Sequence, residues 1–292
     1  GNGICLHDSG LLRYHAFMLQ IAPETTLSLG VVNFLNAVPL IAGLENLDGL
    51  TLVPHVPSEL IGCVEREEVD FALASSIDYQ QSNFDLKMLP TCVLSSEGNV
   101  LTVRVCSKVP FEEVKNMYCD SDSHTSIALM QIIMKQLYGL SPQVIPTEIR
   151  SLNDDLESWP ETILIIGDKV VASKSHHFYP HVLDLGEAWK NQTGLPFVFA
   201  AWFGKANTIQ NKISLAVILL ERQLKCNLHR IEQVVSNHAP QRGWDEQIAK
   251  NYLTQNMEYH CSDEHIQSLE LFYKFASDIG VISTIKQLEI FE

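Results

Sequence analysis

The stretch LSLGVVNFLNAVPL, from Leu27 to Leu40, decides the fold. Its first half, up to Val32, is a largely apolar run, which is typical of a buried strand. Asn33 and Asn36 then flank a tight connection, and Pro39 stands where a helix would begin. A strand that turns directly into a helix leaves backbone N–H groups free at the corner, and these suit an anionic ligand. Asn36 is the first candidate for a functional side chain there.

The bulk composition narrows the class of protein. Hydrophobic residues make up 46% of the 292 positions and charged residues 19%, which is ordinary for a soluble globular chain. No apolar run reaches the ~20 residues that span a bilayer, so we expect no integral membrane protein. The formal charge of −15 and the lack of a basic cluster disfavour nucleic-acid binding. The same charge repels an anionic substrate at long range, so an anion would have to be held by local dipoles and a few placed donors.

The cysteines and the N-terminal residues indicate a cytoplasmic location. Seven cysteines are scattered without a C-x-x-C pair, which favours free thiols in a reducing compartment. Residues 1–27 have no basic n-region, and Arg13, His15 and Gln20 interrupt their apolar stretch, so a signal peptide is not expected. The histidines of segment 176–181 lie in one loop, without a Cys or acidic partner at tetrahedral spacing, so we expect no metal site.

Strand-like and helix-like segments alternate along most of the chain, which predicts an α/β architecture with right-handed crossovers. The predicted strands cover residues 27–32, 50–56, 69–74, 88–94, 100–107, 116–119, 162–168, 182–186 and 196–203. The predicted helices among them cover residues 40–44, 57–66, 110–114, 127–138 and 187–193. After Ile209 the pattern predicts helices only, at 213–224, 228–235, 245–252 and 263–279.

The chain contains no flexible Ser/Gly linker, so two lobes joined by crossing strands are expected. We expect the crossings near residues 105–109 and 199–203. This assigns residues 28–107 and 201–292 to a discontinuous first lobe and residues 108–200 to the second, with residues 1–27 as an N-terminal extension.

Further polar side chains stand at predicted strand ends and helix starts. Ser76 and the turn that contains Ser96 and Asn99 follow strands at the edge where open α/β sheets bind ligands, although both also fit ordinary polar loops. Ser123, Thr125 and Ser126 open the helix at 127–138, where simple capping, worth about 1 kcal/mol, is the alternative to anion binding. Asp168 ends an apolar strand and fits a helix cap, a salt bridge or a contact to a substrate hydroxyl.

Several segments taken together resemble one family: NAVPL at 36–40, EVDFAL at 68–73, SIDY at 76–79, SHTS at 123–126, IGD at 166–168, DLGEAW at 184–189 and TGLPFVFA at 193–200. From about Leu29 to its end the chain resembles the chorismate dehydratases of the futalosine route to menaquinone. The resemblance implies an α/β, two-lobed type II periplasmic-binding-protein-like fold with mixed sheets and a central ligand cleft. It also implies a cytosolic enzyme without a cofactor that removes water from chorismate, a dianion, to give 3-[(1-carboxyvinyl)oxy]benzoate. Ala74 departs from the proline that is common in the family, and residues 1–26 have no counterpart in it.

The resemblance carries Asn36 onto the family's cleft asparagine, whose amide can donate to a carboxylate or to the departing hydroxyl. An Asx turn or a helix cap is the structural alternative for this residue. We expect Asn36 to be catalytic and the following residues to bind substrate: Asn33, Ser76, Ser96, Asn99, Ser123, Thr125, Ser126 and Asp168. No motif supplies a strong base, so we expect a carboxylate of the substrate itself to take the C3 proton that chorismate loses with its hydroxyl group.

Two alternatives stay open, namely the 1,4-dihydroxy-6-naphthoate synthase of the same route and a solute-binding protein without activity. We expect a small-molecule substrate as the binding partner. We also expect the chain to pair with a second copy of itself in a homodimer.

Overall fold

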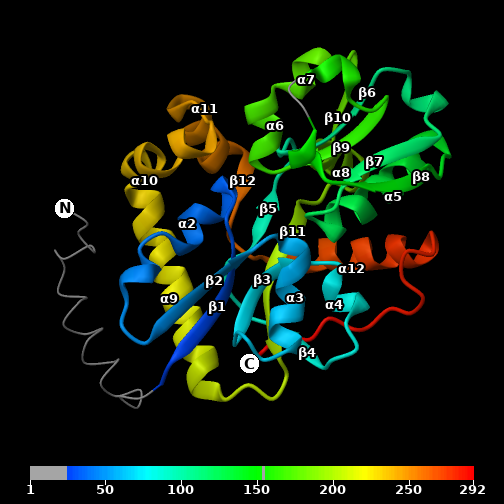
Figure 1. The fold of residues 1–292 in the computed structure, drawn as a ribbon. Helices are drawn as coiled ribbons and strands as arrows, with labels where there is room; N and C mark the ends of the chain where they lie inside the picture. Colours follow the sequence, from blue (N-terminus) through cyan, green and yellow to red (C-terminus); the bar gives the residue numbers. More distant parts are fainter. Residues whose placement is uncertain (1–24, 153–154) are drawn as a thin grey trace.

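The computed structural model describes residues 25–152 and 155–292, and these form two mixed α/β lobes (Figure 1). In this part of the chain the first lobe is built on a seven-stranded sheet, in the order β12 (Met257–Glu258), β5 (Leu94–Ser96), β11 (Phe197–Lys205), β3 (Phe71–Ser75), β1 (Leu27–Val32) and β2 (Leu50–His55), with β4 (Leu86–Met88) beside β11. The second lobe is built on a five-stranded sheet, in the order β10 (His181–Asp184), β6 (Val103–Ser107), β9 (Thr162–Ile166), β7 (Asn116–Asp120) and β8 (Gln143–Thr147).

The first sheet is parallel at its β3-β1-β2 side and antiparallel around β11. Because β1, β2 and β3 run in the same direction, their carboxyl ends meet at one edge, and that edge faces the second lobe. β1 and β3 are almost wholly buried, as their apolar sequences require. This edge of the sheet holds the corner that begins at Asn33.

Helices cover the sheets and connect their strands. The first lobe contains α2 (Val38–Ile41), α3 (Pro57–Glu65), α4 (Asp78–Gln81), α9 (Gln210–His229), α10 (Ile231–His238), α11 (Glu246–Asn251) and α12 (Asp263–Asp278). The second lobe contains α5 (His124–Tyr138), α6 (Asp168–Ser173), α7 (Ser175–Phe178) and α8 (Leu185–Thr193). The long helix α9 packs on α2, and α12 packs on both β11 and α5 (Figure 1).

The short helical turns complete the element list. Turns of 3-10 helix lie at η1 (Leu35–Ala37), η2 (Leu44–Asn46), η3 (Phe111–Glu113), η4 (Ile149–Ser151), η5 (Leu156–Ser158) and η6 (Pro240–Arg242), and η7 (Tyr252–Asn256) is a π-helical turn. η1 holds Asn36, and η6 and η7 flank α11, so these turns carry much of the site described below.

The predicted α/β architecture is confirmed, and β1 covers the predicted residues 27–32 without change. The prediction of one strand over residues 88–94 is wrong, because the chain forms β4 and β5 on either side of an irregular segment. The prediction of helices alone after Ile209 is also wrong, since β12 pairs with β5. β8 was not predicted, and its exposed and half-buried side chains explain why its sequence gives little signal.

The hydrogen-bonding of the strands indicates that the chain passes from one lobe to the other at positions different from those expected. β6 pairs with β9 and β10 in the second sheet, and the whole of β11 pairs in the first. The segments that connect the sheets are therefore residues 97–102 and 194–196. Because hydrogen-bonded ladders define the sheets, we propose these segments as the lobe boundaries in place of 107/108 and 200/201. Of the expected extension, residues 1–24 lie outside the described residues.

The buried core accounts for the aromatic and cysteine residues. Trp189 and Trp202 are fully buried, which confirms that they fill the core. Six of the seven cysteines lie in the described part of the chain and all six are free thiols, as expected; Cys5 lies outside it. No helix among the described residues is both long enough and apolar enough to cross a membrane.

Candidate active site

Three backbone N–H groups at the parallel edge of the first sheet donate hydrogen bonds to oxygens of the second lobe. Leu35 N–H, after β1, donates to both carboxylate oxygens of Asp168 at 3.2 Å. Ser58 N–H, after β2, donates to the Asp122 carbonyl at 3.0 Å. Ile77 N–H, after β3, donates to Thr125 Oγ1 at 3.0 Å. We call the line of contacts made by these three N–H groups the seam.

The free N–H group at the corner after β1 is therefore already hydrogen-bonded in this structure, and its acceptor is the carboxyl group of the protein's own Asp168. Asp168 begins α6 and also accepts a hydrogen bond from Trp244 Nε1 at 2.9 Å. Arg242 lies close to it, with Nε 4.0 Å from Oδ2, and donates from Nη2 to Asn33 Oδ1 at 2.8 Å. Burial raises the pKa of Asp168, while the hydrogen bonds from Leu35 and Trp244 and the nearby positive charges oppose that rise.

Asn36 lies next to Leu35 in η1, and its backbone carbonyl and its side-chain oxygen differ in their hydrogen bonding. Its backbone carbonyl accepts a hydrogen bond from the Tyr259 hydroxyl at 2.9 Å. Its side-chain Oδ1 is buried and has no hydrogen-bond partner among the described residues. A buried acceptor without a donor costs roughly 1–3 kcal/mol, so it is a strong place for a ligand donor to bind.

A second group of predicted residues lies where α5 begins. Thr125 and Ser76 are fully buried, with 3.3 Å between their side-chain oxygens, and Ser76 Oγ also donates to the Val198 carbonyl at 2.7 Å. Ser123 caps α5 by accepting from Ser126 N–H at 3.2 Å, and the two serine hydroxyls lie 3.0 Å apart. Ser123 therefore caps α5, and Thr125 joins the start of this helix to the seam; that these hydroxyls bind substrate stays a prediction.

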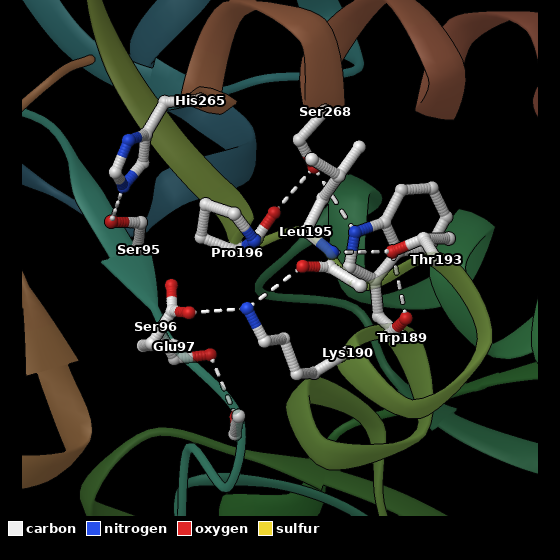
Figure 2. A network of polar contacts seen from close by, with 12 residues as sticks. Ser95, Ser96, Glu97, Trp189, Lys190, Thr193, Leu195, Pro196, His265 and Ser268 are labelled. Atoms are coloured by element: carbon white, nitrogen blue, oxygen red, sulfur yellow. Dashed lines mark hydrogen bonds and ion pairs between the residues drawn. The ribbon is translucent and has the colours of Figure 1, made fainter. Parts of the chain in front are cut away.

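The third group consists of Ser96, the last residue of β5 (Figure 2), and Asn99 in the connection that follows it. Ser96 Oγ is buried and donates to the Gly98 carbonyl at 3.0 Å. The exposed Asn99 is contacted through its backbone carbonyl, which accepts from Asn256 Nδ2 at 2.8 Å. The structure thus joins Asn33, Asn36 and Asp168 in one cluster, and it places the serines and Asn99 in two others.

Figure 2 shows how the two chain crossings are tied to α8 and α12. Lys190 pairs with Glu97 on one crossing and donates to the Gly194 carbonyl, 2.8 Å away, on the other. Ser268 of α12 accepts from Trp189 Nε1 at 3.0 Å and donates to the Pro196 carbonyl. Side chains from both lobes therefore fix the segments through which the chain changes sheet.

Sequence patterns did not single out several residues that complete the cluster around Asn36. Arg242 ends η6 and Trp244 lies between η6 and α11, and both are far from Asn36 in the chain. Tyr252 begins η7; its ring stacks on Trp244 with 4.8 Å between centroids, and its hydroxyl lies 2.8 Å from Thr102 Oγ1. No signal in the sequence pairs these residues, because the contact arises only from how α11 packs.

No group of three or more His, Cys, Asp or Glu side chains within residues 25–152 and 155–292 is arranged to hold a metal ion. The donors at the seam and in the cluster around Asp168 are backbone amides, hydroxyls, the Trp244 indole N–H and the Arg242 guanidinium. Such a set suits an organic anion, which it can bind by hydrogen bonds.

A family model described as "Menaquinone biosynthesis" matches residues 27–278, which include every element of the seam. The chain belongs to this menaquinone biosynthesis family. A curated relative, the chorismate dehydratase of Thermus thermophilus, is 27% identical over 260 residues, which are 84% of this chain and 93% of the relative.

Solved structures similar to this family member share its fold at low sequence identity. Protein AF1704 from Archaeoglobus fulgidus superposes with a TM-score of 0.72 at 13% identity, over 88% of this chain and 99% of that protein. The periplasmic aliphatic sulphonate binding protein SsuA from Escherichia coli gives a TM-score of 0.63 at 13% identity, over 92% and 94% of the two chains. These likenesses confirm the periplasmic-binding-protein-like fold.

Proposed function

We propose that this protein is a chorismate dehydratase that converts chorismate into 3-[(1-carboxyvinyl)oxy]benzoate and water. The observation that carries the proposal is the family match over residues 27–278 together with a chorismate dehydratase relative that aligns over most of both chains. The geometry supports it, because the matched asparagine presents a buried acceptor beside the seam.

The proposed reaction does not require a strong acid or a strong base from the protein. The C4–O bond of chorismate breaks, the C3–H bond gives up its proton, and the departing hydroxide and the proton leave as water. The ring becomes aromatic, so the products are strongly favoured. Orientation and placed hydrogen bonds can then supply much of the rate acceleration.

We assign Asn36 the role of orienting the reacting centre. Its buried Oδ1 can accept a hydrogen bond from the C4 hydroxyl, and its amide can donate to a substrate oxygen. We propose that the substrate's side-chain carboxylate takes the C3 proton, since the cluster contains Asn33, Asn36 and a carboxylate that is already hydrogen-bonded. A chorismate analogue that lacks this side-chain carboxylate should bind without turnover, and normal turnover of the analogue would exclude the role.

The net charge of −15 makes the location of positive groups important for a dianion. Arg242 lies at the Asn33 end of the cluster, and Lys169 lies between Asp120 and Asp122 with its Nζ 6.0 Å from the Phe34 ring centroid. We propose that Arg242 binds one substrate carboxylate. Because the proposed chemistry uses a biosynthetic intermediate, we also place the enzyme in the cytoplasm.

The first experiment follows the loss of the ring-diene absorbance of chorismate with purified wild type, Asn36→Ala and Asn191→Ala. Asn191 is an exposed asparagine on α8 and serves as the matched control. Asn36→Ala should lose about 100-fold or more in kcat, as for other placed hydrogen-bond donors, and Asn191→Ala should keep wild-type activity.

The possible outcomes separate function from site. Binding of chorismate by the wild type without turnover would contradict the enzyme and favour a solute-binding protein. Turnover that survives in Asn36→Ala would keep the proposed function and remove Asn36 from the chemistry.

A further inference from the structure

We propose that Asp168 and Trp244 act as positioning residues: together they dock the second lobe on the corner after β1 and thereby orient Asn36. This inference rests on the proposed function for its link to catalysis. Asp168 belongs to the second lobe, whereas Leu35, Asn36 and Trp244 belong to the first. The contact therefore exists only when the lobes are closed on each other.

The carboxylate of Asp168 is held from two directions. Leu35 N–H donates to both of its oxygens at 3.2 Å, and Trp244 Nε1 donates to Oδ1 at 2.9 Å. The side chain is only 17% exposed, so these hydrogen bonds replace water that the carboxylate has lost. A carboxylate that stays buried without such donors raises the free energy of the folded protein. The hydrogen bonds from Leu35 and Trp244 therefore stabilise the arrangement in which the lobes are closed.

The link from Asp168 to Asn36 consists of the hydrogen-bonded Leu35 N–H and the peptide bond that follows Leu35. Leu35 and Asn36 are consecutive in the three-residue turn η1. Asp168 fixes the amide at the start of this turn, and the Tyr259 hydroxyl fixes the Asn36 carbonyl at 2.9 Å. With the backbone held on both sides, the Asn36 side chain keeps one direction, and its Oδ1 remains buried without a partner among the described residues.

Trp244 extends the contact towards a chain crossing. Its ring stacks on Tyr252 at 4.8 Å with an interplanar angle of 21°. The Tyr252 hydroxyl lies 2.8 Å from Thr102 Oγ1, at the end of the crossing segment 97–102. Movement of the lobes about this crossing would therefore change the position of Trp244 and of its hydrogen bond to Asp168.

The experiment compares Asp168→Asn and Trp244→Phe with the wild type. Asp168→Asn removes the charge and one acceptor, and Trp244→Phe removes the indole donor while it retains an aromatic ring on Tyr252. Both variants should lower kcat for chorismate, Asp168→Asn by about 10- to 100-fold, because misplacement of a reacting group is costly. Leu35 and Trp244 occupy the Asp168 oxygens that were expected to contact substrate, so we replace that expected role by positioning. KM should therefore change less than about threefold.

Asp70→Asn is the matched control. Asp70 is also a half-buried carboxylate, but it belongs to the first lobe, and it accepts from Ser28 N–H at 2.8 Å and from Lys212 Nζ at 2.6 Å, at the opposite end of β1 from Asn36. Asp70→Asn should destabilise the fold without lowering kcat. If Asp168→Asn and Trp244→Phe lower kcat no more than Asp70→Asn does, the positioning role is overturned.

A measurement without substrate separates this inference from the proposed function. Small-angle X-ray scattering should give a larger radius of gyration for Asp168→Asn and Trp244→Phe than for the wild type and Asp70→Asn. Equal radii in all four proteins would overturn the docking contact even if chorismate is turned over. If the two variants show the larger radius but the wild type turns over no chorismate, the proposed function alone is overturned. Trp244→Phe leaves the test intact if Asp168→Asn fails to fold.

Discussion

At the scale of single residues, Gly186 lies where α8 packs against the turn that carries Ser96. A Cβ atom at this position would lie 2.4 Å from the Gly98 carbonyl oxygen and 2.6 Å from Ser96 Oγ. Backbone atoms cannot move aside cheaply, so Gly186→Ala should destabilise the fold by about 1–3 kcal/mol in denaturant unfolding. Gly62→Ala is the control, because its Cβ would meet only the flexible end of Arg66 in the middle of α3. We expect that variant to be neutral or up to about 1 kcal/mol more stable, and an equal loss in both would contradict the steric explanation.

At the scale of elements, α4 of the first lobe and the start of α5 in the second are joined by a histidine–carboxylate pair. His124 Nδ1 lies 2.7 Å from Asp78 Oδ1, and Asp78 is buried. The hydrogen bond to Asp78 raises the pKa of His124 above its ordinary value of 6.5, while burial raises the pKa of Asp78 despite that partner. Glu65 and Tyr273 also face Asp78.

The raised pKa of His124 predicts how stability depends on pH. The folded state binds this proton more tightly than the unfolded state, so its contribution is fully present below pH 6.5 and is lost as the pH rises through the raised pKa. The unfolding free energy of the wild type should therefore fall across the window above pH 6.5. His124→Gln should flatten the curve there, whereas the exposed His260→Gln should not. Parallel curves for wild type and His124→Gln in chemical denaturation would rule the pair out as the cause.

At the scale of the whole molecule, one hydrophobic core runs through both lobes. Leu29 of β1, Trp202 of β11 and Leu164 of β9 belong to the same cluster of buried side chains. Because the two sheets share this core, we expect denaturant to unfold the described part of the chain in one transition, with far-ultraviolet circular dichroism and tryptophan fluorescence changing together. Two separate transitions would show that the lobes are stable independently.

Local sequence predicted those parts of the fold and site that depend on local physics. The apolar runs of β1 and β9 specify buried strands by themselves, and the Ser123 cap marks the start of α5. The corner with Asn36 was also readable, because a strand followed by a helical turn leaves N–H groups free wherever it occurs. By contrast, β12 is only two residues long, and its strand geometry comes from pairing with β5 rather than from its own sequence.

The sequence by itself determined a two-lobed α/β chain, its family, and an anion-binding corner next to Asn36. Only the tertiary structure decided what binds at that corner: the carboxylate of Asp168, 133 positions away from Leu35, with Trp244 as a second donor. The physical reason is that a free backbone N–H is a local property of one turn, whereas its partner is chosen by how two sheets pack. No periodicity or spacing records that packing.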